Sequence, residues 1–217
     1  MRVAVLVSGR GSNLQALIDA RDAGALPVEF VLVASDKPHA QALRRAEDAG
    51  IATLALDPKG YANRAAYDAD LFSRIAAAEP DLIVLAGFMR ILDAAAIAPW
   101  RGRMINIHPS LLPKYPGLHT HARALEAGDR EHGASVHFVT DELDGGPVIA
   151  QARIDMRDGD TPDSLAARLL PREHQLLVAT LSLVAARRIA LDADGVVFDG
   201  APLVAPLRFD DCRIGDR

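Results

Sequence analysis

The sequence predicts an α/β protein with a Rossmann-like, mostly parallel twisted sheet, helices on both faces and an antiparallel element in the C-terminal half. In the first half, short strand patterns alternate with helical patterns, as in sheets built from right-handed crossovers. The apolar run at residues 3–7 has no polar alternation, which is typical of a strand covered on both faces. In the second half, strand patterns at residues 135–140 and 148–154 are separated by a loop too short for a parallel crossover, so they are expected to be antiparallel.

The first half is expected to hold strands at residues 3–7, 28–35, 51–56, 82–86 and 104–107. The turn after the first strand leads into a helix beginning near Leu14, with Ser12 or Asn13 as its N-cap. Further helices are expected at residues 40–49, where Gly50 can close the helix, and at residues 63–78.

The second half is expected to end in a helix at residues 162–188, irregular around Pro171 because proline lacks the helical N–H. Beyond Ala190 the pattern is weak, and no element is predicted there. No repeat, low-complexity block or linker interrupts the sequence, so we expect one domain over residues 1–217. Its two halves are expected at about residues 1–107 and 108–190, followed by a tail at residues 191–217.

Composition and charge argue against several classes of function. Half of the 217 residues are hydrophobic, which suffices for one well-buried core, and the net charge of −5 disfavours nucleic-acid and membrane-surface partners. No apolar run approaches the ~20 residues of a membrane span, and the first strand begins too early for a signal peptide. Cys212 is the only cysteine, so no intrachain disulfide can form and the residue is expected to be inert. A cytoplasmic protein is expected.

A glycine-containing turn, SGRGSN at residues 8–13, follows the first strand. Glycines let the backbone approach an anion, and the free N–H groups of the following helix favour phosphate there. An ordinary strand-to-helix turn has the same composition, and the glycine spacing alone leaves both interpretations open. Leu14 stands where the dinucleotide fingerprint G-x-G-x-x-G has its last glycine, which argues against a nicotinamide cofactor.

Asn106 and His108 form a second candidate site at the end of the fifth strand. Residues two apart in an extended segment face the same side, and Pro109 favours extended backbone at His108. An amide donor beside an imidazole suits acyl transfer, where one stabilises an oxyanion and the other moves protons. Structural hydrogen bonds at a strand end are the alternative interpretation.

The third candidate is the acidic loop DELDGGP at residues 141–147. Such loops are commonly solvated turns; in the functional interpretation, one carboxylate reaches His108, orients it and favours its protonated form. His119 and His121 suggest a metal pair, but no further ligands stand nearby in sequence, so we expect no metal site. His137 lies in a strand pattern and is expected to be a hydrogen-bonded core residue or a support for the site.

Four motifs in order resemble phosphoribosylglycinamide formyltransferases, a family of folate-dependent enzymes. They are SGRGSNL at residues 8–14, AGFMRIL at 86–92, NIHPSLLP at 106–113 and DELDGGP at 141–147. Each motif alone is modest, whereas the four together are specific, and the match runs to about His174. The asparagine, histidine and aspartate are shared across formyl-handling enzymes, so they indicate the chemistry better than the substrate.

The resemblance implies a role for each matching position. The residues that match the phosphate-binding segment are Gly11, Ser12 and Asn13, and the catalytic trio is matched by Asn106, His108 and Asp144. The residues that match folate contacts are Arg64, Met89, Arg90, Ile91, Leu92 and Asn106, together with Thr140, Asp141, Glu142, Leu143 and Asp144 around the pterin ring. Glu173 matches a contact on the nucleotide side, where Leu170 would offer only backbone groups because Pro171 alters the segment.

The implied reaction moves the formyl group of 10-formyltetrahydrofolate to the amine of glycinamide ribonucleotide, in de novo purine biosynthesis. Asn106 and protonated His108 would stabilise the oxygen of the tetrahedral intermediate, and Asp144 would support the charge. The resemblance implies small-molecule partners, no metal, no nicotinamide or flavin, and a monomer or homodimer.

Three other functions compete with this reaction. A formyltetrahydrofolate hydrolase would use water in place of the amine and carry an extra N-terminal regulatory domain, whereas the first strand is expected at Arg2 and Val3. A methionyl-tRNA formyltransferase would carry an additional C-terminal domain and a basic surface. A non-catalytic nucleotide-binding module would need only the glycine turn and would leave Asn106, His108 and Asp144 unused.

Overall fold

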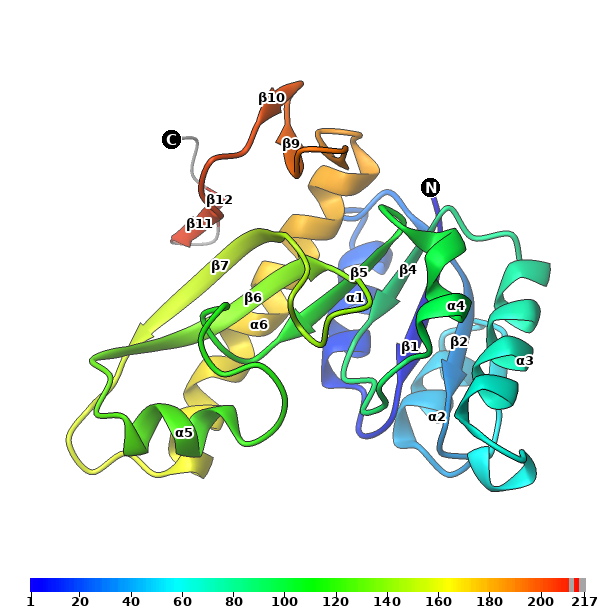
Figure 1. Ribbon diagram of the computed structural model, residues 1–217, viewed down its shortest axis with the longest axis horizontal. Coiled ribbons are helices and arrows are strands. Elements are labelled where there is room, and N and C mark those ends of the chain that lie inside the picture. The colour runs from blue at the N-terminus through cyan, green and yellow to red at the C-terminus, as the bar shows by residue number, and fades with distance from the viewer. Residues whose placement is uncertain (211–212, 215–217) are drawn as a thin grey trace. The chain divides into compact units, whose positions relative to one another are not determined.

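The structure is a computed structural model that describes residues 1–210 and 213–214 of the chain (Figure 1). The chain divides into two units, Met1–Asn106 and Ile107–Arg217, which we describe in turn. Cys212, expected to be inert, lies outside the described residues.

The first unit, whose residues are all described, holds a parallel sheet in the order β5-β4-β1-β2-β3. Its strands are β1 (Arg2–Val7), β2 (Glu29–Ser35), β3 (Thr53–Ala55), β4 (Leu82–Leu85) and β5 (Met104–His108), close to the predicted positions; the last two residues of β5 already belong to the second unit. From β1 the chain moves outward to β2 and β3, then returns to β4 on the other side of β1. The strand order therefore reverses between β1 and β4, and ligands of open α/β sheets bind at the carboxyl ends of such strands.

The helices of the first unit cover both faces of this sheet, with α1 against α2 and α3 against α4 (Figure 1). They are α1 (Ser12–Asp22), α2 (Gln41–Asp48), α3 (Arg64–Ala77) and the short α4 (Ala94–Ile97), with 3₁₀ turns η1 (Pro58–Gly60) and η2 (Ala98–Trp100). Gly50 follows α2 with a φ of 69°, as expected of a residue that closes a helix.

The start of α1 differs from the prediction. The helix begins at Ser12, and its N-cap is Gly11, with a φ of 73° and a ψ of 34°. Ser12 and Asn13, the predicted caps, are the first helical residues. Glycine adopts this left-handed conformation without steric cost, so the chain turns sharply from β1 into the helix one residue earlier than a serine cap would allow.

The described residues of the second unit include an antiparallel pair, β6 (Glu131–Phe138) and β7 (Val148–Asp155), which confirms the predicted antiparallel element. β11 (Leu207–Asp210) runs parallel to β7 and pairs with β12 (Arg213–Ile214). The long helix α6 (Pro162–Ala185) packs on β6 and β7, and α5 (Thr120–Glu126) packs on α6 (Figure 1). The predicted fold class is therefore confirmed, with parallel pairing in the first unit and antiparallel pairing in the second.

Two features of the second unit lay beyond the sequence pattern. α6 runs as one α-helix through Pro171, where an irregularity was expected; the carbonyl that loses its helical partner is that of Ala167, an exposed residue, so it can bond to water. The weakly patterned tail forms a small antiparallel sheet of β8 (Ile189–Leu191), β9 (Val196–Phe198) and β10 (Ala201–Pro202).

None of the helices within residues 1–210 and 213–214 combines the length and hydropathy that crossing a membrane requires.

Candidate active site

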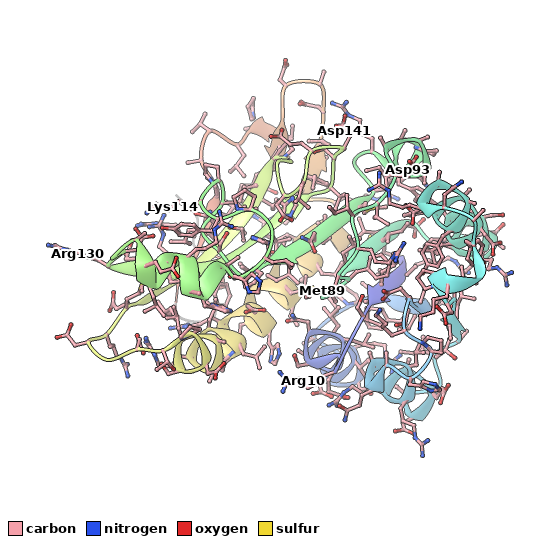
Figure 2. The ribbon with its side chains drawn as sticks, turned by 60° about the horizontal axis from the view of Figure 1, so that its bottom comes forward. Arg10, Met89, Asp93, Lys114, Arg130 and Asp141 are labelled. Atoms are coloured by element: carbon pink, nitrogen blue, oxygen red, sulfur yellow. The ribbon has the colours of Figure 1, made fainter. Side chains whose placement is uncertain are left out.

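The carboxyl ends of β1 and β4 are joined by hydrogen bonds at the point where the strand order reverses. The Ser8 N–H donates to the Gly87 carbonyl at 3.0 Å, and the Ser8 hydroxyl accepts from the Met89 N–H at 2.8 Å. The same hydroxyl donates to the buried carboxylate of Asp36, at the end of β2, at 2.5 Å. Figure 2 labels Arg10 of the glycine turn and Met89 and Asp93 of the segment after β4. The two predicted loops are therefore tied together through one serine.

The glycine turn, residues 8–13, presents the start of α1 without a side-chain cap. The four N–H groups at the start of a helix have no helical acceptors, so an uncapped helix start favours an anion. Gly11 is required twice over: its φ is positive, and a Cβ there would lie 2.6 Å from the Ala42 Cβ. Gly11, Ser12 and Asn13, the predicted phosphate-binding residues, all lie at this helix start.

The segment after β4 carries four of the eleven residues predicted to contact folate, at positions 89–92. Met89 and Ile91 are 70% and 55% exposed, although both are apolar. The segment is fixed at its start by Ser8 and at its end by Asp68, whose buried carboxylate accepts from the Asp93 N–H at 2.7 Å. Exposed apolar side chains on a fixed backbone suit a flat, apolar ligand.

Two cations predicted to lie on the folate side influence the same buried carboxylate. The Arg90 guanidinium carbon lies 4.5 Å from the ring centroid of Tyr67, which is fully buried. Burial raises the pKa of Asp68, and the charges of Arg90 and Arg64 oppose that rise. Arg64 is exposed at the first position of α3, and Leu92 is half-buried.

His108 ends β5 with both ring nitrogens close to acceptors. Its Nε2–H donates to the Tyr115 carbonyl at 2.9 Å, and its Nδ1 lies 3.4 Å from Asp144 Oδ2. Asn106 stands two residues earlier on the same strand and so faces the same side as His108. The His108–Asp144 contact was predicted from the sequence, whereas the Tyr115 carbonyl was not.

Asp144 is fixed by the loop that carries it. Its Oδ2 accepts from the Gly117 N–H at 2.8 Å, and its Oδ1 lies 3.7 Å from His137 Nε2. Its φ is 51°, a left-handed conformation that aspartate tolerates better than most residues. His137 is buried, and its Nδ1–H donates to the Phe138 carbonyl at 2.9 Å. The structure thus places His137, buried and hydrogen-bonded, beside Asp144.

The loop that holds Asp144 turns back on the end of β6. A Cβ at Gly146 would collide with the Phe138 carbonyl, so the loop requires glycine at that position. The other predicted pterin-side residues are at least partly accessible: Thr140 is half-buried, and Asp141, Glu142 and Leu143 are exposed. The loop therefore presents several accessible groups around one well-fixed carboxylate.

Burial sets the charge states of the His108–Asp144 pair. Burial lowers the pKa of His108 below its ordinary value; the Tyr115 carbonyl and Asp144 act to raise it, and His137 and Arg123 lower it further. Burial alone would raise the pKa of Asp144, but bonds from His137 and Gly117 and the charge of His108 bring it below the ordinary value. Asp144 does favour the protonated form of His108, as expected, but burial outweighs it, so the resting imidazole is neutral at neutral pH.

Other predicted residues lie elsewhere in the second unit. Glu173 is buried and Leu170 is half-buried, both on α6. His119 is exposed, and His121 Nδ1 lies 2.9 Å from His132 Nε2, so these rings pair with each other. Within residues 1–210 and 213–214, no three histidine, cysteine or acidic side chains form a group suited to a metal ion.

Several supporting residues were not predicted from the sequence. Asp36 follows β2 directly, so a polar residue at a strand's carboxyl end was the available signal. Asp68 and Tyr67 lie within a helical pattern, where nothing in the sequence distinguishes them from ordinary helix residues. The carbonyl of Tyr115 and the N–H of Gly117 are backbone groups, which no residue type signals.

These features define a class: an α/β protein with a helix start suited to phosphate and a buried imidazole–carboxylate pair beside an amide. The model of the formyl transferase family matches residues 1–181, and the chain belongs to this family.

The names of its relatives describe a more specific activity than the name of the family does. The chain is 50% identical over 203 residues to a phosphoribosylglycinamide formyltransferase of Escherichia coli, covering 94% of this chain and 96% of that protein. It is 51% identical over 185 residues to the trifunctional purine biosynthetic protein adenosine-3 of Drosophila melanogaster, covering 84% of this chain and 14% of that protein. The solved phosphoribosylglycinamide formyltransferase of Coxiella burnetii, in complex with CHES, is 45% identical and superposes with a TM-score of 0.92, covering 97% of this chain and 99% of that one.

Proposed function

We propose that this protein transfers the formyl group of 10-formyltetrahydrofolate to the amine of glycinamide ribonucleotide. The products are formylglycinamide ribonucleotide and tetrahydrofolate, in de novo purine biosynthesis. This choice of substrate is supported by the sequence identity of 50% and 45%, over nearly the full length of the chain, to two proteins named phosphoribosylglycinamide formyltransferase. The observation that carries the chemistry is the buried His108–Asp144 pair at the end of the strand that also bears Asn106.

The proposed mechanism is direct attack by the substrate amine. The amine nitrogen bonds to the formyl carbon, the carbonyl oxygen becomes an oxyanion, and the Asn106 amide donates to it. His108, neutral at rest, accepts a proton from the attacking amine, and Asp144 stabilises the imidazolium. The bond from the formyl carbon to the folate nitrogen then breaks, and that nitrogen takes up a proton, so the proton count balances.

His108 must exchange one contact to take part. Its Nε2–H is bonded to the Tyr115 carbonyl, and its Nδ1 faces Asp144. We propose that this contact is released when the substrates bind and that the ring proton then lies on Nδ1, towards Asp144. Nε2 is thereby left unprotonated and can accept the proton of the attacking amine. One oxyanion donor is worth ~100–1000-fold in rate and general acid–base catalysis ~100–10,000-fold, with much of the remainder supplied by positioning.

The remaining residues are proposed to bind the two substrates. Gly11, Ser12 and Asn13 bind the phosphate, and Glu173 and the Leu170 backbone contact the nucleotide. Residues 89–92 and Arg64 contact the folate, and residues 140–144 enclose its pterin ring. Formyl transfer changes no oxidation state, so the reaction needs no redox cofactor, and the proposed groups supply its electrostatics without a metal. We propose that both units act as one formyltransferase domain, as a monomer or homodimer.

The test is an assay of tetrahydrofolate release from 10-formyltetrahydrofolate, with and without glycinamide ribonucleotide. We expect release only with the ribonucleotide, together with equimolar formylated product. Equal release in its absence would indicate a hydrolase. No release under either condition, from protein that binds the ribonucleotide, would indicate a binding module.

A further inference from the structure

We propose that Arg45 of α2 is a positioning residue for the phosphate-binding turn. It holds the carbonyl of Arg10 so that the backbone N–H groups of the turn face the phosphate. This inference rests on the proposed function, because it concerns the turn that we propose binds the ribonucleotide phosphate.

Helix α2 contacts the backbone of the turn at three successive residues. The Ala42 N–H donates to the Gly9 carbonyl at 3.1 Å, and the Arg45 Nε–H donates to the Arg10 carbonyl at 2.8 Å. At Gly11 the backbone approaches so closely that a Cβ would lie 2.6 Å from the Ala42 Cβ. The Gly11 carbonyl then accepts the first helical bond of α1, from the Gln15 N–H at 2.9 Å.

These contacts fix the direction of the N–H groups through the geometry of the peptide bond. In a planar trans peptide, the carbonyl and the following N–H point in opposite directions. With the Gly9 carbonyl bonded to α2, the Arg10 N–H points away from that helix. With the Arg10 carbonyl bonded to Arg45, the Gly11 N–H points away from the guanidinium. Two donors thus add to those of the helix start before any ligand binds, which is preorganisation.

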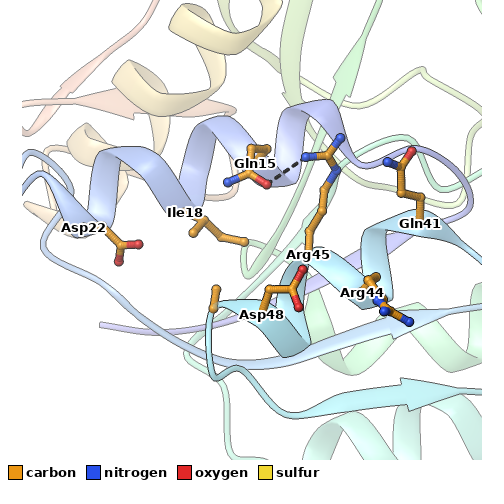
Figure 3. Close-up of a pocket in the computed structure, with 8 residues that line it drawn as sticks. Gln15, Ile18, Asp22, Gln41, Arg44, Arg45 and Asp48 are labelled. Carbon is orange, nitrogen blue, oxygen red and sulfur yellow. Dashed lines mark hydrogen bonds between the residues drawn. The ribbon is translucent and has the colours of Figure 1, made fainter.

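The guanidinium of Arg45 is itself held in position. Its Nη1 donates to Gln15 Oε1 at 2.9 Å, and the Gln15 amide donates to Asp19 Oδ1 at 2.8 Å. Figure 3 shows Arg45 reaching from α2 to Gln15 on α1, with the bond drawn as a dashed line. Arg45 therefore connects two helices and the turn between β1 and α1. A solvent-directed arginine would supply charge only, whereas this one has a specific backbone acceptor.

Arg44 is a natural control. It stands next to Arg45 on α2 and is exposed, so replacing either removes one positive charge from the same helix. Only Arg45 bonds to the turn. Charge alone predicts similar effects at the two positions, and positioning predicts an effect at Arg45 alone.

The experiment measures steady-state kinetics of Arg45→Met, Arg45→Lys and Arg44→Met, with inorganic phosphate as a competitor of glycinamide ribonucleotide. For Arg45→Met we expect KM for the ribonucleotide and Ki for phosphate to rise roughly tenfold, while kcat and KM for the folate stay within about twofold. Arg45→Lys keeps the charge but can reach only one of the two acceptors, so an intermediate increase is expected. Arg44→Met should match the parent protein.

The outcomes separate this inference from the proposed function. Unchanged Ki for phosphate in Arg45→Met overturns the inference while the activity assay still supports the function. Equal increases in Arg44→Met and Arg45→Met also overturn it, in favour of a charge effect. Phosphate that fails to compete in the parent protein overturns both the phosphate-binding turn and the role of Arg45. If Arg45→Met does not fold, Arg45→Lys decides between the same alternatives.

Discussion

The two units of the protein use different chemistry at their candidate sites. The first unit offers mainly backbone N–H groups and exposed apolar side chains, held by buried or partly buried side chains such as Ser8, Asp36 and Asp68. The second unit offers titratable side chains, His108 and Asp144, whose charge states are set by burial and by close neighbours. The first arrangement suits binding that is insensitive to pH, and the second suits proton transfer. Changes in the loops after β1 and β4 should therefore alter KM, whereas changes at His108 and Asp144 should alter kcat and its pH dependence.

The largest expected effect comes from His108→Ala. Loss of the imidazole removes the proposed proton acceptor, so kcat should fall ~100–10,000-fold. KM for both substrates should change little, since the residue acts mainly in the transition state. Steady-state kinetics and a thermal melt of the variant check this. A folded variant with near-normal kcat would remove His108 from the mechanism.

Asp144→Asn tests the electrostatic half of the comparison. Because the Asp144 charge acts to raise the pKa of His108, its loss should lower that pKa further. The acidic limb of the kcat profile that reports His108 should move to lower pH, and kcat should fall. Asparagine can still accept from Gly117, so the loop is expected to survive. Asp158→Asn, an exposed acid on the same unit, is the control; equal profiles for the two variants would contradict the coupling.

Ser8→Ala tests whether the first unit acts by holding its loops. The change removes the acceptor of the Met89 N–H and the donor to buried Asp36, at a cost of ~1–3 kcal/mol in unfolding free energy. KM for the folate should rise several-fold with a smaller change in kcat, as measured by kinetics and denaturant unfolding. Ser8→Thr keeps the hydroxyl and should restore most of the loss. If Ser8→Ala instead lowered kcat alone, the division between the units would be wrong.

The last expected effect concerns stability against acid, not activity, and lies in the second unit. Burial, with His121 beside it, lowers the pKa of His132 from 6.5 to about 4. Between these values the unfolded chain binds a proton that the folded protein does not, so the unfolding free energy falls as pH falls, by about 3 kcal/mol at most.

His132→Gln should therefore flatten the decline in stability between pH 6.5 and pH 4 relative to the parent protein. Denaturant unfolding at several pH values measures the slope, which is compared in place of absolute stability because the His121 bond is also lost. His39→Gln, an exposed histidine of the first unit, serves as control. An unaltered slope would mean that His132 does not set this pH dependence.

Much of the fold could be predicted because the strands of the first unit are continuous apolar runs bounded by turns. The helix start was placed late, since a left-handed Gly11 is a property of the backbone and Ser12 resembles an ordinary cap. The sheet of the tail was missed because its strands have only two or three residues. Periodicity carries little information over such lengths.

The candidate site was predicted unevenly for a physical reason. Asn106, His108 and Asp144 are residue types with distinctive chemistry, so the sequence singles them out. Their supports are a carbonyl at Tyr115, an N–H at Gly117 and a carboxylate at Asp68, which depend on tertiary contacts between segments far apart. The charge state of His108 also required the structure, because burial outweighed the neighbour that the sequence suggested.

The close approach of Gly11 and Ala42 links two positions that are thirty-one residues apart. With glycine fixed at position 11 by its backbone conformation, a side chain larger than alanine at position 42 would force α2 outward. Among sequences that share this turn, position 42 should then be restricted to alanine or glycine. A bulky residue there should occur only together with a different partner for the carbonyl of residue 10.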